Sequence, residues 1–222
     1  MILALSNSKG GVGKTTLAVH LAVWMAEQGR NVAFVDSDVQ GSSSGWLQEA
    51  APEMQTFRLV TPEDVVAQLP QIQARFDYVI ADGPAGLSEV TRAILCLADL
   101  ALFPCGPSIL DLRAVIEAIN VLKKIQAFRQ GLPQMLIVPN KLQHQYRLSK
   151  ELLQTIQGWG MPVGDGIRLR QAYADAAGQG TVVWRMASRS AREASAELQF
   201  LFQQLSTYEP TPTHPDHRSA TA

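Results

Sequence analysis

The chain has 222 residues, of which 46% are hydrophobic and 18% charged, and its formal net charge is −1. These values suit one medium-sized globular domain with a substantial core. No apolar run is as long as a membrane span, which excludes an integral membrane helix, and the first residues lead straight into a strand-like run, which is unlike a signal peptide. We therefore expect a cytoplasmic protein whose two cysteines, Cys96 and Cys105, are reduced core residues.

The first motif follows the apolar run Ile2–Leu5 and reads Ser-Lys-Gly-Gly-Val-Gly-Lys-Thr-Thr over residues 8–16. A helical pattern over Thr16–Gln28 comes next, so the order is strand, glycine-rich loop, helix. This order is typical of a phosphate-binding loop, in which backbone N–H groups turn toward phosphate oxygens. We expect nucleotide contacts from seven consecutive residues: Gly10, Gly11, Val12, Gly13, Lys14, Thr15 and Thr16.

Within this loop, Lys14 is expected to reach the β- and γ-phosphates, and the Thr15 hydroxyl to ligate Mg²⁺. Lys9, five positions before Lys14, cannot easily fold back onto the γ-phosphate of its own nucleotide. It could reach across to a nucleotide held by a second, facing copy of the chain.

Acidic residues follow two further strand-like runs. Asp36 and Asp38 come directly after Val32–Val35, and their spacing lets both carboxylates point toward one site. They could instead cap the helical run near Trp46–Ala50. Asp82, followed by Gly83, ends the run Tyr78–Ala81 in a Walker-B arrangement, in which the acid completes a Mg²⁺ site through water and the glycine lets the γ-phosphate approach.

Short apolar runs alternate with helical patterns along the whole chain. This alternation predicts an α/β fold: a doubly wound, mostly parallel sheet with helices on both faces, which binds its ligand at the carboxyl ends of the strands. The further expected strands are Phe57–Val60, Ala101–Phe103 and Met135–Val138, and the further expected helices are Pro62–Gln73, Leu87–Leu97, Leu110–Arg129 and Leu148–Gln157.

The base preference depends on the segment after Met135–Val138. Guanine-specific relatives carry Asn-Lys-x-Asp there, whereas this chain has Asn140-Lys-Leu-Gln143. The loss of the acid favours adenine, with Asn140 as a candidate base contact. An exposed loop asparagine without that role is nearly as good an interpretation.

The charge is unevenly distributed. Residues 1–112 carry a balance of −6 and residues 113–192 a balance of +8. A basic segment in a near-neutral protein favours sequence-independent contacts to nucleic-acid phosphates, although solvated charges scattered over the surface would give the same count. Besides Arg113 at its start, the basic residues of this segment are Lys123, Lys124, Arg129, Lys141, Arg147, Lys150, Arg168, Arg170, Arg185, Arg189 and Arg192.

The segment Thr207–Ala222 contains three prolines among Thr, His, Ser and Ala, which is typical of a disordered tail. We therefore expect one ATPase domain over residues 1–206 and a tail over 207–222. The tail lacks the pattern of an amphipathic membrane-binding helix, so no membrane partner is expected.

Together, Lys-Gly-Gly-x-Gly-Lys-Thr from Lys9, Asp36-x-Asp38-Val-Gln and Asp82-Gly-Pro-Ala-Gly resemble the ParA/MinD family of deviant Walker-A ATPases. Val39 stands where the family motif has proline. The resemblance implies that Lys9 acts in trans in a nucleotide-sandwich dimer, that Asp36 and Asp82 belong to the Mg²⁺ site, and that Asp38 orients the attacking water. It therefore implies ATP and Mg²⁺ as cofactors, with Lys9, Lys14 and Asp38 as the catalytic set.

The resemblance is greatest to short ParA-type proteins. It implies an ATP-dependent homodimer that binds nonspecific nucleoid DNA, is released when a ParB-like adaptor stimulates its slow hydrolysis, and so segregates plasmid or chromosome DNA. The alternatives are an McdA-like ATPase that positions carboxysomes with an McdB-like adaptor, and a MinD-like division regulator at the membrane. McdA-like relatives are noted for lacking the signature lysine, so Lys9 favours partition. An ATP-dependent ligase of the same superfamily would need a substrate pocket that the sequence does not suggest.

Overall fold

The structure is a computed structural model that describes residues 1–143 and 145–208. Six strands form one sheet in the order β3-β2-β4-β1-β5-β6, and every neighbouring pair is parallel. The predicted doubly wound parallel fold is therefore confirmed. The strands are β1 (Ile2–Leu5), β2 (Val32–Asp36), β3 (Gln55–Arg58), β4 (Tyr78–Asp82), β5 (Leu100–Cys105) and β6 (Gln134–Pro139).

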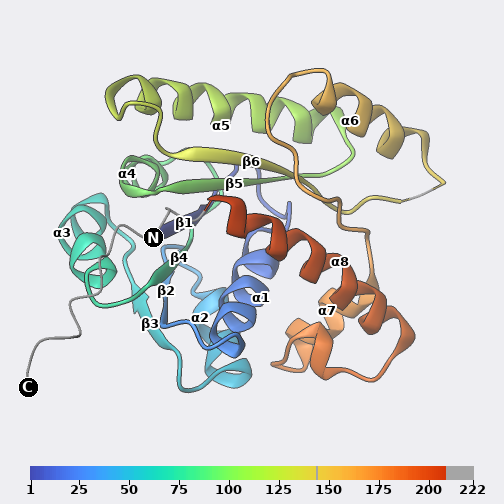
Figure 1. Ribbon diagram of the computed structural model, residues 1–222, viewed down its shortest axis with the longest axis horizontal. Coiled ribbons are helices and arrows are strands. Elements are labelled where there is room, and N and C mark those ends of the chain that lie inside the picture. The colour runs from blue at the N-terminus through green and yellow to red at the C-terminus, as the bar shows by residue number, and fades with distance from the viewer. Residues whose placement is uncertain (144, 209–222) are drawn as a thin grey trace, which may run out of the picture.

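Helices cover both faces of the sheet (Figure 1). One face carries α1 (Lys14–Glu27), α2 (Ser42–Ala50), α7 (Gln171–Gly178) and α8 (Arg189–Leu205), and the other carries α3 (Pro62–Gln73), α4 (Glu89–Leu97), α5 (Ile109–Phe128) and α6 (Arg147–Gln157). Two short 3₁₀ helices, η1 (Val183–Arg185) and η2 (Ser206–Tyr208), lie before and after α8.

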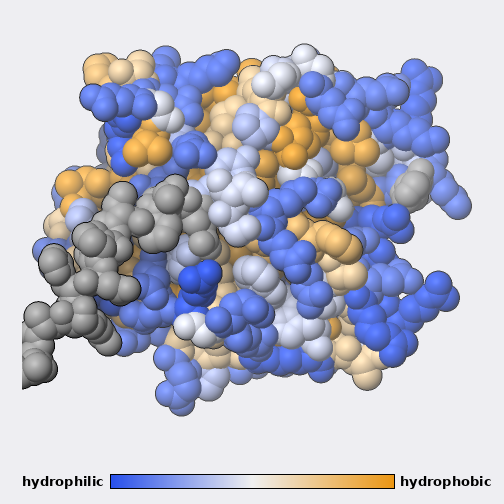
Figure 2. All heavy atoms as spheres, viewed as in Figure 1, coloured by the Kyte–Doolittle hydropathy of each residue, from blue (hydrophilic) through white to orange (hydrophobic). Residues whose placement is uncertain are grey.

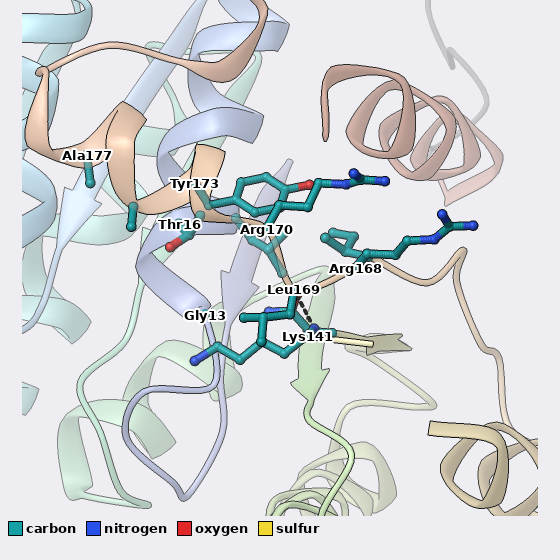
Figure 3. Close-up of a pocket in the computed structure, with 12 residues that line it drawn as sticks. Gly13, Thr16, Lys141, Arg168, Leu169, Arg170, Tyr173 and Ala177 are labelled. Carbon is teal, nitrogen blue, oxygen red and sulfur yellow. Dashed lines mark hydrogen bonds between the residues drawn. The ribbon is translucent and has the colours of Figure 1, made fainter. Parts of the chain in front are cut away.

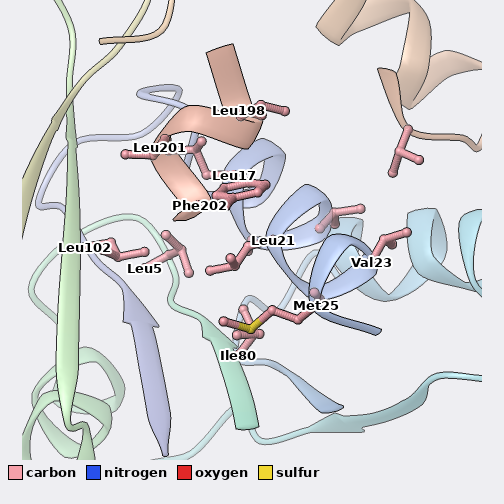
Figure 4. Packing of buried hydrophobic residues seen from close by; sticks show 14 of the residues in the cluster. Leu5, Leu17, Leu21, Val23, Met25, Ile80, Leu102, Leu198, Leu201 and Phe202 are labelled. Atoms are coloured by element: carbon pink, nitrogen blue, oxygen red, sulfur yellow. The ribbon is translucent and has the colours of Figure 1, made fainter. Parts of the chain in front are cut away.

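Strand alternation builds a separate core on each face. In β1, Leu3 and Leu5 point to the face of α1 and α8, whereas Ile2 and Ala4 point to the opposite face. Helix α1 is buried on most of its circumference because it lies between the sheet and α8 (Figure 4). The phosphate loop is thus fixed at both ends, by a central strand before it and a buried helix after it.

Several predicted boundaries need correction. Strand β3 covers Gln55–Arg58 rather than Phe57–Val60, because it lies at the edge of the sheet and its side chains are only half buried or exposed. Cys105 is buried in β5 as expected, but Cys96 is exposed on α4 and is no core residue.

Helices α7 and α8 were not predicted. Helix α8 is nevertheless signalled by Ser188, whose side chain accepts a hydrogen bond from the amide of Ala191, and by buried residues at helical spacing. These are Ala191, Ala194, Leu198, Leu201 and Leu205. The small residues of α7 give a weaker pattern.

Of the expected tail, Thr207 and Tyr208 belong to η2, and residues 209–222 lie outside the described part of the chain. Within the described residues, none of the helices combines the length and the hydropathy needed to cross a bilayer. On the face shown in Figure 2, hydrophilic residues separate the apolar ones into several small groups.

Candidate nucleotide-binding site

The glycine-rich loop joins β1 to α1 and has a backbone that other residues would not adopt. Gly11 and Gly13 have φ angles of +73° and +101°, in the left-handed region that favours glycine. A Cβ atom at Gly13 would also lie 2.2 Å from the Nδ2 atom of Asn140. The loop therefore needs glycine at position 13 for two independent reasons, backbone conformation and close approach to the end of β6.

The loop borders a cavity of about 250 Å³ at the carboxyl ends of the strands. Motifs from three separate parts of the sequence meet there, since Lys14, Asp38 and Gly83 all line it. The strand order explains this convergence, because β4 pairs with both β1 and β2. The complete lining is Gly10, Gly11, Gly13, Lys14, Thr15, Thr16, Asp38, Gly83, Ala85 and Lys141.

Lys14 begins α1, and its side chain is almost fully buried. Its ammonium nitrogen lies 3.3 Å from the backbone oxygen of Lys9, so it already points over the loop. Burial lowers the pKa of Lys14, while the nearby charges of Asp82 and Asp38 raise it. Such a cation in a loop of turned-in amides suits a phosphate anion.

Lys9 takes a different direction from Lys14. Its ammonium nitrogen lies 2.8 Å from Oδ1 of Asp111, in the first turn of α5, and the Lys9 side chain is 41% exposed. Asp111 also accepts a 2.5 Å hydrogen bond from the hydroxyl of Ser108, the N-cap residue of α5. Lys9 is therefore held by an aspartate of its own chain, away from the Lys14 side chain.

The three predicted metal-site residues lie on neighbouring elements. Asp36 and Asp82 are register partners in β2 and β4, and the hydroxyl of Thr15 donates a 2.8 Å hydrogen bond to Oδ2 of Asp82. Asp36 is fully buried and accepts hydrogen bonds from the amide of Asp38 and from both the amide and the hydroxyl of Ser44. In this arrangement Asp36 also fixes the loop that follows β2.

The buried carboxylate of Asp82 has one oxygen, Oδ1, that has no hydrogen-bond partner among the described residues. Burial raises the pKa of Asp82 to about 7, and the hydrogen bond from Thr15 acts in the opposite direction. An orphaned carboxylate oxygen beside a threonine hydroxyl is a hard, oxygen-only donor set of the kind that Mg²⁺ prefers. The residues present therefore fit a magnesium ion held by Thr15 and Asp82, with Asp36 nearby.

Asp38 lies in a tight turn between β2 and α2. Its amide donates to Oδ1 of Asp36 at 3.0 Å, and its own Oδ1 accepts from the amide of Gln40 at 2.9 Å. The turn closes with a 3.0 Å hydrogen bond from the amide of Gly41 to the backbone oxygen of Asp38. Asp38 is half buried and lines the phosphate cavity.

A second cavity, of about 240 Å³, adjoins the first and shares Gly13, Thr16 and Lys141 with it. The segment from Ile167 to Ala177 forms its other wall (Figure 3). Tyr173 lies over this cavity, and burial raises the pKa of its hydroxyl above the ordinary range. A mostly apolar cavity continuous with a phosphate site suits a nucleoside base.

Asn140, the candidate base contact, lines this second cavity but is buried. Its Nδ2 atom donates a 2.7 Å hydrogen bond to the backbone oxygen of Val12, and its Oδ1 atom accepts from the amide of Lys141. The exposed-loop interpretation of Asn140 is therefore wrong. Its main contact in this structure is to the phosphate loop.

Lys141 is a site residue whose role no sequence motif indicates, although it belongs to the basic segment. Its ammonium group donates a 2.6 Å hydrogen bond to the backbone oxygen of Gly11, and its φ angle is +56°. Together with Asn140 it fastens the end of β6 to the phosphate loop. Asp111 was not predicted either, and no local sequence signal identifies it as the partner of Lys9.

Most arginines of the basic segment are paired with carboxylates. Arg170 contacts both Glu193 and Glu197 of α8, and its side chain is 12% exposed. In Figure 3, Arg168 and Arg170 extend away from the cavity toward α8. The other ion pairs are Arg168–Glu197, Arg185–Glu27, Arg189–Glu193 and Arg147–Glu151, and Arg129 donates to the backbone oxygen of Ala98.

Within residues 1–143 and 145–208, the exposed basic residues of that segment whose side chains form no hydrogen bond or ion pair are Lys123, Lys124, Lys150 and Arg192, together with Arg113. The densest group of arginines in the sequence is therefore mainly structural. The available positive charge lies on α5, at the start of α6 and at the start of α8.

A buried histidine links the nucleotide end of α1 to the C-terminal part of the chain. His20 lies 2.7 Å from the backbone oxygen of Thr16 and accepts a 3.2 Å hydrogen bond from the amide of Val183. Burial lowers its pKa to about 4. The ring is therefore neutral at physiological pH, with its proton on Nδ1, and it packs edge-on against Trp46, Tyr173 and Trp184.

Comparison with known proteins agrees with this geometry. One relative, the "Maintenance of carboxysome distribution protein A" of Halothiobacillus neapolitanus, is 29% identical over 201 residues, which cover 88% of this chain and 92% of that protein. A solved complex of a Cyanothece McdA variant with ATP has a TM-score of 0.76 at 17% identity and covers 93% of this chain and 95% of its own. MinD of Pyrococcus horikoshii OT3 with Mg-ADP has a TM-score of 0.69 at 20% identity, with coverages of 89% and 93%. At these identities the two solved structures show a shared fold.

The family model described as "CobQ/CobB/MinD/ParA nucleotide binding domain" matches residues 3–183. These residues run from β1 to the first residue of η1 and contain every predicted nucleotide and metal residue. The chain belongs to this nucleotide-binding family, which includes the ParA/MinD ATPases.

Proposed function

We propose that the protein is a positioning ATPase that hydrolyses ATP with Mg²⁺ and switches between a free state and a nucleotide-sandwich dimer. The observation that carries the proposal is that two lysines of one loop have different surroundings. Lys14 points over the phosphate cavity, whereas Lys9 leaves it and pairs with Asp111. In the dimer, Lys9 would exchange its contact with Asp111 for the nucleotide on a second copy.

ATP and Mg²⁺ are the proposed cofactors. In support, the solved relatives hold ATP in one case and Mg-ADP in another, and Asp82 offers an unpartnered buried oxygen beside Thr15. When bound, the metal ion would neutralise charge on the β- and γ-phosphates. Thr15 and Asp82 would hold it, with Asp36 in the surrounding shell, while Lys14 and the loop amides would bind the phosphates.

Hydrolysis needs a water molecule positioned opposite the leaving group, and Asp38 is the residue we assign to that role. It lines the phosphate cavity from the turn after β2. Lys14 lines the same cavity, so the two side chains border one phosphate site. The expected slow rate follows from the lack of a strong base or cis arginine in the motifs, so a partner that stimulates turnover is required.

The test is a comparison of wild type with Lys9→Ala. With ATP and Mg²⁺, the wild type should shift from monomer to dimer in light scattering, and the variant should bind ATP yet stay monomeric. An ATP-dependent dimer of undiminished affinity in the variant would contradict the role of Lys9 in trans.

The cargo has two candidates. Lys9 and the unpaired basic residues on α5 favour ATP-controlled binding to nonspecific nucleoid DNA and partition of a plasmid or chromosome with a ParB-like adaptor. A dimer doubles the number of phosphates contacted, which strengthens the counterion-release contribution to DNA affinity.

The similarity to a carboxysome-distribution protein over 88% of the chain supports McdA-like positioning of a protein organelle with an McdB-like adaptor equally well. Co-sedimentation of the ATP-bound protein with each purified adaptor class would separate the two. A MinD-like membrane role is tested by ATP-dependent binding to lipid vesicles, which we expect to be negative.

A further inference from the structure

The turn that carries Asp38 is held from outside by a side chain that none of the motifs includes. Arg58, the last residue of β3, donates from Nη2 to the backbone oxygens of Asp38 at 3.1 Å and of Val39 at 2.9 Å. One guanidinium group thus bridges two consecutive carbonyls of the turn. Its charge strengthens both hydrogen bonds relative to neutral donors.

Gly41 has no side chain, so the guanidinium group of Arg58 can occupy the space beside it. A Cβ atom at Gly41 would lie 2.2 Å from Nη1 of Arg58, and the φ angle of Gly41 is +67°. Arg58 is brought close because β3 pairs with β2 and places Arg58 in register with Asp36. The contact therefore follows from the sheet register and from the glycine at the end of the turn.

Apart from the hydrogen bond from Arg58, little restrains the backbone of Val39, the second residue of the turn. Val39 occupies that position with its side chain 73% exposed, and among the described residues its amide donates no hydrogen bond. The second position of such a four-residue turn is where proline fits best, because the ring sets φ near −65° and no amide is needed. A valine there has greater backbone freedom, which Arg58 restricts.

We propose that Arg58 is a positioning residue for hydrolysis: it locks the Asp38–Gly41 turn so that the Asp38 carboxylate stays at the phosphate cavity. This rests on the proposed function of Asp38 in water orientation. Among the described residues, Asp38 is the one cavity-lining residue that accepts a hydrogen bond from the Arg58 side chain, and it does so through a backbone atom. Its loss should therefore affect the chemical step more than nucleotide binding.

The test uses the full chain and four variants: Arg58→Ala, Val39→Pro, the double variant with both changes, and Arg75→Ala. Arg75 is a matched control, because it is also an exposed arginine that contacts β3, through Gln55, but it lies away from the turn. The measurements are single-turnover phosphate release, the Kd of a fluorescent ATP analogue, and amide hydrogen exchange of a peptide that covers residues 37–46.

In Arg58→Ala we expect phosphate release to slow about 10-fold while the nucleotide Kd changes less than about 3-fold, since a small misplacement of a catalytic group affects the rate before it affects binding. Exchange in the 37–46 peptide should increase. Val39→Pro in the Arg58→Ala background should restore most of the rate and the protection, because proline fixes the same turn. Val39→Pro alone and Arg75→Ala should behave like wild type.

An unchanged rate in Arg58→Ala, or a double variant as slow as Arg58→Ala, would overturn the positioning role while leaving the ATPase proposal intact. If wild type releases no phosphate, the proposed function fails instead. Hydrogen exchange then still decides whether Arg58 holds the turn, and unaltered exchange in Arg58→Ala would reject it.

Discussion

The nucleotide end of the sheet and the arginine-rich C-terminal segment are both rich in charged residues, and the structure uses those charges in opposite ways. At the nucleotide end, Lys14 and Asp38 line a cavity, and the buried Asp82 accepts a hydrogen bond from Thr15, which also lines it. In the C-terminal segment, Arg168, Arg170 and Arg189 are paired with glutamates of α8. Charge in a short motif with fixed spacing therefore predicts a site, whereas the net charge of a long segment does not show which of its charges remain available.

The largest effect should come from Lys14→Ala. The variant loses the cation that the loop directs at the phosphates, so ATP affinity should fall at least about 100-fold, since a desolvated charge-assisted contact to phosphate contributes several kcal/mol. Isothermal titration calorimetry with ATP and Mg²⁺ measures this. Normal affinity would show that the loop is not the phosphate site.

Asp38→Ala separates binding from chemistry. We expect hydrolysis to drop about 100-fold, since a group that orients the nucleophile typically contributes two or more orders of magnitude, with ATP binding and dimer formation retained. Phosphate release and light scattering with ATP are the measurements. Faster turnover in this variant would reject the catalytic role of Asp38.

Arg170→Met tests the structural interpretation of the second region. Removing a nearly buried guanidinium from Glu193 and Glu197 should lower the free energy of unfolding by roughly 2 kcal/mol, because two carboxylates lose a charged hydrogen-bond partner. Urea unfolding monitored by circular dichroism measures it. The exposed Arg189→Ala is the control, with an expected decrease within about 0.5 kcal/mol.

Substitution of Lys123 and Lys124 tests whether the exposed cations of α5 contact DNA. They are exposed and, within the described residues, unpaired, so changing both to glutamine should leave stability unchanged and weaken ATP-dependent binding to nonspecific DNA several-fold. The slope of log affinity against log salt should decrease by about 1 for each phosphate that the variant no longer neutralises. DNA binding equal to wild type would show that Lys123 and Lys124 do not contact DNA. If substitution of each other exposed basic residue also left DNA binding unchanged, a protein cargo would be favoured.

The fold and the core of the site could be predicted because each depends on local sequence. Alternation of apolar strands with helices indicated the parallel sheet. Residues 8–16, 36–38 and 82–83 each lie at or just after the carboxyl end of a strand, so their convergence follows from the fold class. Helix α8 was not predicted because its first buried positions are the small residues Ala191, Ala194 and Ser195 and the apolar Phe200 is exposed, so the pattern behind the Ser188 cap is weak.

The remaining site contacts depend on long-range geometry that spacing does not encode. Lys9 pairs with Asp111, 102 residues later, and Arg58 reaches back about 20 residues to the turn of Asp38. Asn140 and Lys141 contact the phosphate loop from about 130 residues away. None of these partners is indicated by a periodic pattern, because each is fixed only when β3, β6 and α5 take their places beside the loop.

The position of α8 against α1 has a practical consequence for anyone who wishes to shorten this protein. The recognised family segment stops at residue 183, yet α8 begins six residues later and covers α1 through Leu198, Leu201 and Phe202. A truncation at the family boundary would keep every motif and uncover the apolar side of the helix that anchors the glycine loop. Expression fragments should therefore extend through Leu205.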